Sequence, residues 1–267
     1  MSSPITFPAG FDKALALEAA GLVNQAYAEY LAFKAHDPNW RLQGPYDDIA
    51  HFSAEPQGIL GGLLEKVEPF GFVARKQGTK NIFVVFRGTQ SPGDLLSDIS
   101  FTQTSPSWQG WGKVEGGFWK LYRQCSASVI NGAKAAGAGA NVFVTGHSLG
   151  SAMATLAVAD LVNAGIASSL YVFASPRVGD LDFATKFNGS VAAKWRVTNT
   201  EDIVTTVPLA TAAVGTMAIP KNLFSAMLDL ASQLNFEHVG TPVSFTDHKG
   251  SVIGNHGMAT YVAALGG

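Results

Sequence analysis

The sequence predicts an α/β fold in which a largely parallel sheet is covered by helices on both faces. Short stretches rich in β-branched and aromatic residues alternate with longer stretches of helical periodicity over most of the chain. Several of the short stretches are apolar throughout, as is typical of buried strands in a parallel sheet. No internal repeat, low-complexity tract or linker interrupts the 267 residues, so we expect one domain over residues 1–267.

The first predicted element is a long helix over residues 11–34, because the apolar residues there form one stripe at helical spacing. Asp37-Pro38 is expected to end this helix, since proline cannot continue it. Gly and Pro punctuate residues 40–69, which predicts a loop with short helical turns, one of them at residues 59–64.

Two strands are expected next, at residues 70–75 and 81–87, and the Gln-Gly-Thr-Lys segment between them predicts a hairpin. Residues 90–115 are polar and rich in Gly and Pro, with one amphipathic piece inside. A helix is expected over residues 115–135, followed by a loose connection of Ala and Gly.

The stretch NVFVTGHSLGSAMATLAVAD at residues 141–160 contains the motif on which the functional predictions depend. A buried strand at residues 142–145 continues into a Gly-His-Ser-Leu-Gly turn, and helix-forming residues follow. Strand, Gly-x-Ser-x-Gly and helix together force Ser148 into a strained turn with an exposed hydroxyl. Both glycines are needed because side chains at these positions would collide with the neighbouring strand and helix.

Beyond this motif, strands and helices alternate up to an edge strand and a closing helix. The expected strands are residues 169–174, 194–199 and 243–246, and the expected helices are residues 179–187, 221–234 and 256–265. Strands that are connected through helices in this way pair in parallel.

A Gly-x-Ser-x-Gly motif alone also fits an ordinary turn with a serine N-cap, so a nucleophilic serine needs partners. The acid is expected where a later strand ends, and Asp202 follows the 194–199 strand, ahead of two apolar residues that would anchor it. Glu201 is the alternative acid and is expected to be solvated. Asp180 and Asp182 are instead expected in the first turn of a helix, where they complement the helix dipole.

The base should be a histidine downstream of the acid, and three residues qualify: His238, His248 and His256. We favour His256, because it follows a Gly-Asn pair and is therefore expected at the end of a loop. His147, inside the serine turn, cannot point back at the serine and is expected to pack on the sheet.

Two backbone amides are expected to stabilise an oxyanion next to the serine. Leu149 supplies the first, because it follows the nucleophile directly. Thr89 supplies the second, because it follows the 81–87 strand at a turn marked by Gly88, and its hydroxyl could add a side-chain donor. The alternative for this turn is a plain end of a strand.

Four segments carry a resemblance to a known family: NIFVVFRGT, VTGHSLGSAMATLA, YVFASPRVGD and WRVTNTEDIVTTVP. Taken in order, they resemble the class 3 (fungal-type) lipase family of α/β hydrolases, over the stretch from Phe70 to His256. The resemblance implies the α/β-hydrolase fold and a serine carboxylic-ester hydrolase that works through an acyl-enzyme, with a triacylglycerol lipase favoured. On this resemblance the nucleophile, acid and base are Ser148, Asp202 and His256, and the oxyanion pair is Thr89 and Leu149.

The resemblance also implies a short lid after the oxyanion strand, within residues 91–101. Its helix would place Leu95, Leu96 and Ile99 on one side and Asp94 on the other. Closed, the apolar side would cover a cleft, and open, it would make transient contact with a lipid–water interface. A fixed surface helix is the alternative.

The composition excludes several other classes of function. A formal net charge of −2 and a charged share of 14% give no electrostatic basis for binding nucleic acid, whereas 47% hydrophobic residues favour an apolar ligand such as a lipid ester. Cys125 is the only cysteine, so an intrachain disulfide is impossible. No cluster of Cys, His and carboxylates has metal-ligand spacing, so we expect neither a metal nor an organic cofactor.

Residues 203–220 carry no charge, but their Thr, Gly and Pro content argues against a transmembrane segment. No secretory signal peptide is visible, so a cytoplasmic location or export by a signal-less route is expected, although the resembled family suggests secretion. Three alternatives to a triacylglycerol lipase remain open: a phospholipase A1, a feruloyl-type esterase and a catalytically silent lipid-binding module.

Overall fold

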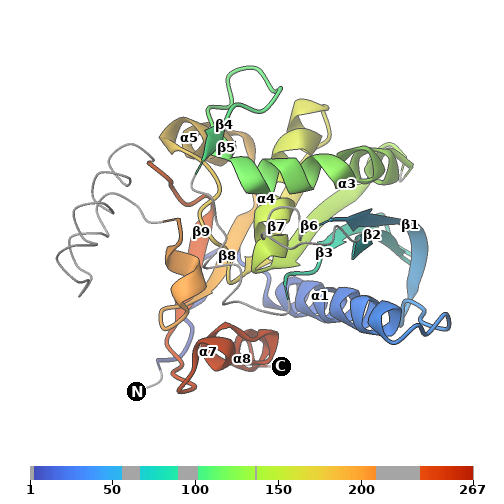
Figure 1. The fold of residues 1–267 in the computed structure, drawn as a ribbon, viewed down its shortest axis with the longest axis horizontal. Coiled ribbons are helices and arrows are strands. Elements are labelled where there is room, and N and C mark those ends of the chain that lie inside the picture. Colours follow the sequence, from blue (N-terminus) through green and yellow to red (C-terminus); the bar gives the residue numbers. More distant parts are fainter. Residues whose placement is uncertain (1–2, 56–66, 90–101, 136, 209–234, 267) are drawn as a thin grey trace.

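The computed structural model describes residues 3–55, 67–89, 102–135, 137–208 and 235–266 (Figure 1). A central sheet has the strand order β1-β2-β3-β6-β7-β8-β9, and a small second sheet pairs β4 with β5. The strands are β1 (Tyr46–Ala54), β2 (Glu68–Lys76), β3 (Asn81–Phe86), β4 (Gln103–Thr104), β5 (Val114–Glu115), β6 (Asn141–His147), β7 (Ser168–Phe173), β8 (Lys194–Asn199) and β9 (Thr241–Phe245). The helices are α1 (Lys13–Lys34), α3 (Gly116–Ala135), α4 (Leu149–Asn163), α5 (Leu181–Ser190), the 3₁₀ turn η2 (Ile203–Thr206), α7 (Val252–His256) and α8 (Met258–Ala264).

The main sheet is largely parallel. Strands β3, β6, β7, β8 and β9 run in parallel, and β1-β2-β3 form an antiparallel meander at one edge. Helices α3, α4 and α5 connect successive parallel strands, which confirms the alternation expected from the sequence. The carboxyl ends of the parallel strands therefore meet at one edge of the sheet, where functional sites form in α/β proteins.

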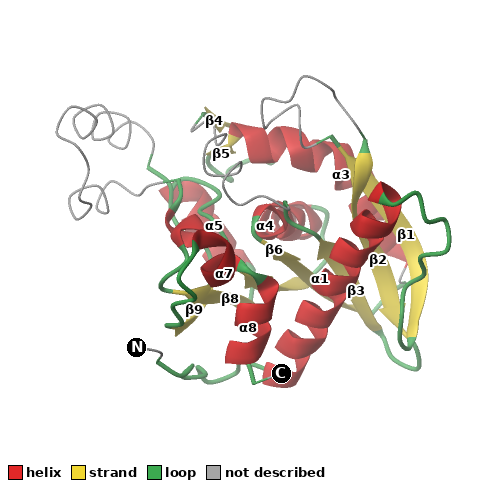
Figure 2. Ribbon diagram, turned by 60° about the horizontal axis from the view of Figure 1, so that its bottom comes forward, coloured by secondary structure: helices red, strands yellow, loops and turns green. Residues whose placement is uncertain are grey.

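Both faces of the sheet are covered by helices, as predicted. Alternate residues of β3 point into two different cores, because side chains along a strand alternate between the faces. Val84 and Phe86 pack in the core that includes residues of α3 and α4, whereas Phe83 and Val85 pack in the core that includes residues of α1 and α8. Figure 1 shows α3 and α4 above the sheet and α1 below it, and Figure 2 shows α8 beside α1.

The expected bounds of the other elements lie close to those observed. Helix α1 begins after Asp12, whose side chain accepts a hydrogen bond from the Leu15 amide at 3.0 Å. Strand β8 covers the same residues as its prediction, and Asp180 caps α5 by accepting from the Phe183 amide at 2.8 Å. The predicted turn at residues 59–64, the lid within residues 91–101 and the helix at residues 221–234 lie outside the described residues.

The prediction of a loop throughout residues 40–69 is wrong, because this segment contains strand β1. Strand β1 pairs with β2 at the edge of the sheet, and its register shifts between Asp48 and Ala50 and again between Phe52 and Ser53. Its outward side is polar and exposed, so the stretch lacks the continuous apolar pattern of a buried strand.

The prediction of one closing helix over residues 256–265 is also wrong. The segment forms two short helices that meet at Gly257, so His256 is the last residue of α7 rather than the end of a loop. The Gly257 amide donates to the Ile253 carbonyl and ends α7, while Gly257 is also the N-cap of α8.

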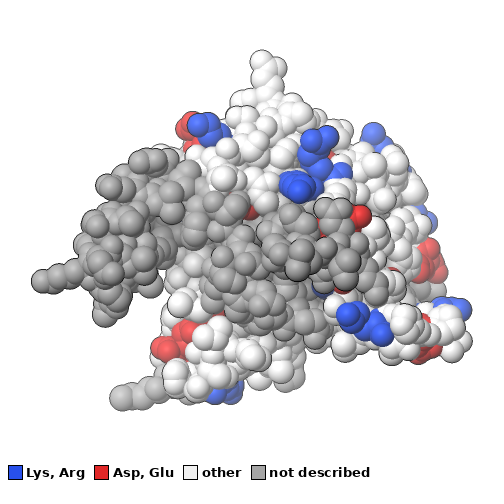
Figure 3. Space-filling model, in the orientation of Figure 1, with Lys and Arg blue, Asp and Glu red and all other residues white. Residues whose placement is uncertain are grey.

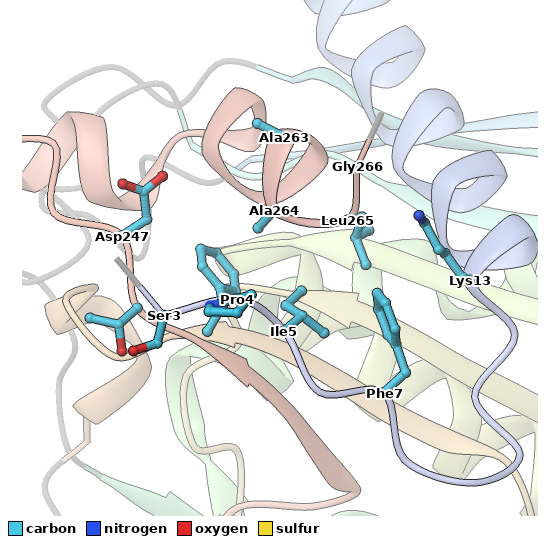
Figure 4. A pocket seen from close by; sticks show the side chains of 12 residues that line it. Ser3, Pro4, Ile5, Phe7, Lys13, Asp247, Ala263, Ala264, Leu265 and Gly266 are labelled. Carbon is cyan, nitrogen blue, oxygen red and sulfur yellow. The ribbon is translucent and has the colours of Figure 1, made fainter. Parts of the chain in front are cut away.

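A cavity of about 440 Å³ lies between the first described residues, β9 and α8 (Figure 4). The Ser3 amide donates to the Thr246 carbonyl at 2.9 Å, which fixes the first residues beside β9. Apolar side chains such as Ile5 and Phe7 form much of the lining, with Lys13 among the few charged residues there (Figure 4). None of the predicted site residues lines this cavity.

Candidate active site

Ser148 occupies the turn between β6 and α4. Its backbone has φ 58° and ψ −126°, a conformation that L-residues rarely adopt, which agrees with the strained turn expected from the motif. The Ser148 side chain is fully buried, so the prediction of an exposed hydroxyl is wrong for this structure. One reason is that the backbone at Gly88 packs directly against Ser148. The approach is so close that a Cβ added to Gly88 would lie only 2.9 Å from Ser148 Cβ.

The two glycines of the motif allow close approaches of the backbone that side chains would prevent. A Cβ on Gly146 would lie 2.3 Å from the Gly150 carbonyl oxygen, and a Cβ on Gly150 would lie 2.4 Å from the Arg87 carbonyl oxygen. The Ser151 hydroxyl lies 2.8 Å from the Gly146 carbonyl oxygen and 2.6 Å from that of Phe173, which fastens the first turn of α4.

Asp202 and His256 form a buried pair beyond the carboxyl end of β8. His256 Nδ1 lies 2.8 Å from Asp202 Oδ2, and the two side chains are 2% and 0% exposed, respectively. The Val204 amide donates to Asp202 Oδ1 at 3.0 Å, and the Tyr261 hydroxyl donates to Oδ2 at 2.6 Å. Burial, together with the charge of Asp202, raises the pKa of Tyr261 well above its ordinary value, so this hydroxyl remains a donor.

The anchoring expected from the two residues after Asp202 is only half correct. Val204 is fully buried, whereas Ile203 is 41% exposed. The Asp202 carboxylate is therefore fixed by Val204, by Tyr261 and by His256, and not by burial of both apolar neighbours.

Ser148 Oγ and His256 Nε2 are buried atoms without a hydrogen-bond partner among the described residues. Because a neutral His256 donates from Nδ1 to Asp202, its Nε2 is an acceptor and can take a proton from a serine hydroxyl. His147 precedes Ser148, and its ring centroid lies 4.6 Å from that of His256, which brings the two segments together. A base commonly tightens onto its nucleophile only when substrate is bound.

The amides expected to form the oxyanion pair lie on the two turns next to Ser148. Leu149 is the first residue of α4, where a backbone N–H has no partner within the helix. Thr89 follows Gly88, and a Cβ on Gly88 would lie 2.5 Å from the His147 carbonyl oxygen. The Gly88-Thr89 turn and the serine turn are therefore in direct contact.

Arg87 holds this turn from inside the protein. Its Nη1 donates to the Gly88 carbonyl at 2.9 Å and its Nε to the Pro69 carbonyl at 2.6 Å. The buried guanidinium also forms an ion pair with Glu68 and lies 4.0 Å from the centroid of the Tyr30 ring. Because a peptide unit is planar, fixing the Gly88 carbonyl also fixes the direction of the Thr89 N–H.

A cavity of about 250 Å³ opens beside these residues. Its lining contains both predicted site residues and residues from three helices: Asn24, Tyr27, Thr89, His147, Ile253, His256, Gly257 and Met258. The candidate base and one candidate oxyanion residue therefore face the same space, which is about half the volume of the cavity beside β9.

Neither of the two alternative histidines bonds to the Asp202 carboxylate. His238 Nε2 donates to the Thr205 carbonyl at 2.9 Å, and burial together with the Arg196 charge lowers the pKa of His238 to about 2. His248 is exposed and lies 3.0 Å from Glu201, the alternative acid. Of the three candidates, only His256 contacts the predicted acid.

Sequence reasoning missed three residues that contact the site: Tyr27, His147 and Tyr261. Tyr261 lies in α8 and binds Asp202, although nothing in its spacing from the acid announces this contact. His147 was expected to pack on the sheet, and it instead bonds to the Tyr27 hydroxyl and to the His256 carbonyl. The available signal was a polar residue at the end of an otherwise apolar strand, which needs a partner when it is buried.

The charges, the potential metal ligands and the helix lengths of the described residues bear on other classes of function. Figure 3 shows basic and acidic residues scattered in small groups over the described part of one face, without a continuous basic surface. Within the described residues, no group of three or more His, Cys, Asp or Glu side chains could hold a metal ion. The helices of the described part are too short or too polar to cross a membrane.

Residues 83–212 match the family model described as "Lipase (class 3)", a stretch that includes Thr89, Ser148 and Asp202. A secreted mono- and diacylglycerol lipase A from Penicillium cyclopium is 34% identical over 143 residues, which cover 52% of this chain and 47% of that protein. A lipase from Rhizomucor miehei is 36% identical over 147 residues, with 52% and 40% covered. Over this stretch the chain is similar to class 3 lipases.

A third relative, with a different named activity, aligns over a longer stretch. A phospholipase A1 EG1 from Oryza sativa subsp. indica is 28% identical over 226 residues, which cover 73% of this chain and 50% of that protein. The chain thus spans about half the length of the sequence relatives named here.

Solved structures agree with the fold. The lipase from Rhizopus microsporus var. chinensis superposes with a TM-score of 0.58 at 27% identity, covering 78% of this chain and 73% of that chain. A mutant of the Penicillium cyclopium lipase MDLA gives a TM-score of 0.66 at 22% identity, covering 92% and 84%. The predicted α/β-hydrolase fold is therefore confirmed. His256 lies outside the family match, so its assignment depends on the contact with Asp202.

Proposed function

We propose that this protein is a member of the class 3 lipase family and a serine carboxylic-ester hydrolase that cleaves acyl esters of lipids. The observation that carries the proposal is the buried Asp202–His256 pair, in which His256 Nε2 is left as an unpaired acceptor. His256 packs against His147, the residue before the serine in the strained turn. Acyl transfer by a serine hydrolase requires a nucleophile, a base that takes its proton and an acid that orients the base.

The proposed reaction begins when Ser148 Oγ attacks the ester carbonyl carbon while His256 Nε2 takes its proton. Asp202 holds the imidazole in the tautomer with a proton on Nδ1 and stabilises the imidazolium that forms. The amides of Thr89 and Leu149 bind the oxyanion of the tetrahedral intermediate. The imidazolium then protonates the leaving alkoxide.

The acyl group is now bonded to Ser148 Oγ, and a second half-reaction releases it. His256 removes a proton from water as the water attacks the acyl carbonyl carbon, and the same two amides bind the second oxyanion. Collapse of this intermediate breaks the bond to Ser148, and the imidazolium returns the proton to the serine. All proton transfers involve side chains of the chain itself and water.

An acylglycerol is the substrate that the relatives favour. Two of the sequence relatives are lipases, and one of these two is a mono- and diacylglycerol lipase. Exposed aliphatic residues beside the site support transient contact with a lipid–water interface. Ile253 is 72% exposed and Val252 44%, and both lie on α7, within four residues of His256. The lid with Asp94, Leu95, Leu96 and Ile99 remains a prediction.

A phospholipase A1 is the second candidate function, because the relative of that name aligns with a longer part of this chain than the other two sequence relatives described above. The two functions share the triad and differ in the headgroup that must fit beside it. Action outside the cell is part of the first proposal, since the Penicillium relative is a secreted lipase. Assay of the culture fluid and of the cells producing the full chain tests that location.

The decisive experiment combines labelling by a fluorophosphonate with a panel of substrates for the purified protein. Ser148→Ala should fold with the wild-type circular dichroism spectrum, lose the label and lose all but a trace of ester hydrolysis. The panel contains an emulsified triacylglycerol, a diacylglycerol, a phosphatidylcholine vesicle and a feruloyl ester. Preferred cleavage of the vesicle at the first acyl position favours the phospholipase, and an unlabelled wild-type protein without hydrolysis contradicts enzymatic activity and favours a lipid-binding module.

A further inference from the structure

Tyr27 and His147 form a chain of hydrogen bonds that ends at the backbone of the candidate base, and the predicted oxyanion turn packs against it. Tyr27 Oη lies 2.8 Å from His147 Nδ1, and His147 Nε2 lies 2.7 Å from the His256 carbonyl oxygen. Gly88 packs against the same tyrosine hydroxyl, because a Cβ added to Gly88 would lie 2.4 Å from Tyr27 Oη. Helix α1, the turn after β3, the end of β6 and α7 therefore meet at these two side chains.

The direction of each hydrogen bond follows from the chemistry of the groups. A carbonyl oxygen can only accept, so the proton of the His147 ring is on Nε2, facing His256. Burial, together with the nearby His256, lowers the pKa of His147 well below its ordinary value, so the ring is neutral and Nδ1 carries no proton. The Tyr27 hydroxyl must then donate to Nδ1.

We propose that Tyr27 and His147 are positioning residues, which hold the oxyanion turn and the backbone of the base in register across the serine turn. This inference rests on the proposed function, because it assigns Thr89 and His256 their roles. Gly88 is the point of contact: a Cβ there would lie 2.4 Å from Tyr27 Oη and 2.5 Å from the His147 carbonyl oxygen.

His256 is held twice in this arrangement. Asp202 fixes its ring at Nδ1, whereas His147 fixes its backbone carbonyl, at the junction where α7 ends and Gly257 begins the turn to α8. The base sits on a five-residue helix, which has little stability of its own, so a contact from another element is needed to fix it.

The neutral state of His147 is also part of its role. Its ring centroid lies only 4.6 Å from that of His256, which becomes an imidazolium during the proposed reaction. A second positive charge at this distance would oppose the protonation of the base. A ring nitrogen that accepts from Tyr27 presents no such charge, and it cannot compete with His256 for the serine proton because it is already bonded.

The test compares kcat per active site in variants that remove one link at a time. Tyr27→Phe deletes the hydroxyl, His147→Leu deletes both ring contacts, and His147→Gln offers an amide donor toward the His256 carbonyl. Tyr122→Phe is the matched control, because its hydroxyl also makes a buried 2.8 Å hydrogen bond, to Asp160. Fluorophosphonate titration counts the competent serines in each preparation.

We expect kcat per titrated site to fall about tenfold in Tyr27→Phe and about a hundredfold in His147→Leu, with KM unchanged, since small displacements of catalytic groups slow the chemical step. His147→Gln should recover part of the loss. Tyr122→Phe should lower the melting temperature but leave kcat per site at the wild-type value. If Tyr27→Phe behaves like Tyr122→Phe, the two residues are merely structural and the proposal is wrong.

Nitrogen-15 spectra of the histidine rings test the hydrogen-bond chain without any assay of activity. In the wild type, His147 should remain a neutral ring protonated on Nε2 from pH 5 to pH 9, and Tyr27→Phe should shift the Nδ1 resonance. A His147 that titrates in this range, or that carries its proton on Nδ1, overturns the proposal. A protein with the expected His147 spectrum but neither label nor ester hydrolysis would instead contradict only the proposed function.

Discussion

Two carboxylate–histidine pairs involve the consecutive residues Glu201 and Asp202. They contain the same kinds of group but differ greatly in their exposure to solvent. Asp202 and His256 are separated by 2.8 Å and nearly excluded from solvent, whereas the adjacent Glu201 lies 3.0 Å from His248 with side chains that are 40% and 61% exposed. Water screens the exposed pair and competes for its hydrogen bonds, so the pair contributes little to stability. The buried pair has no such competitor, which is the condition a proton-transferring pair requires.

The largest expected difference between the pairs concerns the histidines. His256→Ala should reduce kcat for a soluble ester by about four to six orders of magnitude, because the proton of Ser148 then has no acceptor. His248→Ala should retain wild-type kcat. Measuring kcat of both variants at saturating substrate makes the comparison, and an inactive His248→Ala with an active His256→Ala would reverse the assignment of the base.

The acids should differ almost as much. Asp202→Asn keeps the shape of the side chain but can stabilise neither the correct tautomer nor the imidazolium, so kcat should fall by about 10⁴-fold. Glu201→Gln is the control on the exposed pair and should change kcat less than twofold. Circular dichroism of both variants excludes unfolding as the cause. Equal losses in the two variants would show that burial does not distinguish the acids.

Tyr261 sharpens the comparison because its hydroxyl donates a hydrogen bond to the carboxylate of the buried pair. Tyr261→Phe removes the donor that lies 2.6 Å from Asp202 Oδ2, while the ring remains packed in the core. A hydrogen bond to a charged group typically contributes about 1.5–3 kcal/mol, so the free energy of unfolding should fall by that amount. Urea denaturation measures it, and a change below about 0.5 kcal/mol would mean that water replaces the hydroxyl.

The smallest effect is expected at His51, which extends the comparison to a third histidine. Hydrogen bonding to Glu29 and, against the opposing effect of burial, to Asp48 raises the pKa of His51 to about 9. Since the folded protein holds the proton more tightly, this stabilisation is present in full below about pH 6.5, the ordinary histidine pKa, and is lost as the pH rises through about 9.

His51→Gln should therefore destabilise the protein by less than about 1 kcal/mol at pH 6, because the pair is partly exposed. The difference from the wild type should vanish at pH 10. Thermal denaturation at both pH values measures it, and a difference that grows with pH would contradict the sign of the shift.

Site residues could be predicted from the sequence where the pattern lies in consecutive residues, and not where it depends on contacts between distant parts of the chain. The serine turn and the candidate acid after β8 follow from a few consecutive residues, so the structural settings of Ser148 and Asp202 could be predicted. The candidate base could not be separated from two other histidines by pattern alone, because what distinguishes His256 is a contact across 54 positions. The contact between Tyr27 and His147 spans 120 positions and left no local trace.

The same principle explains the strand that the sequence did not indicate. Buried strands are recognisable because both faces are apolar, whereas β1 has one polar face and two shifts of register. Its membership of the sheet is decided by pairing with β2 and not by its own residues.

The two edge strands of the main sheet, β1 and β9, also differ in what hinders pairing with a strand of another molecule. A strand at the edge offers unpaired backbone groups to any other chain, which is the usual beginning of aggregation. At β1 the exposed Asp47 and Asp48 and the irregular register make a second strand difficult to add. At β9 the Ser3–Thr246 bridge occupies part of the edge instead. The polar character that hid β1 in the sequence therefore also makes this edge a poor template for a strand of another molecule.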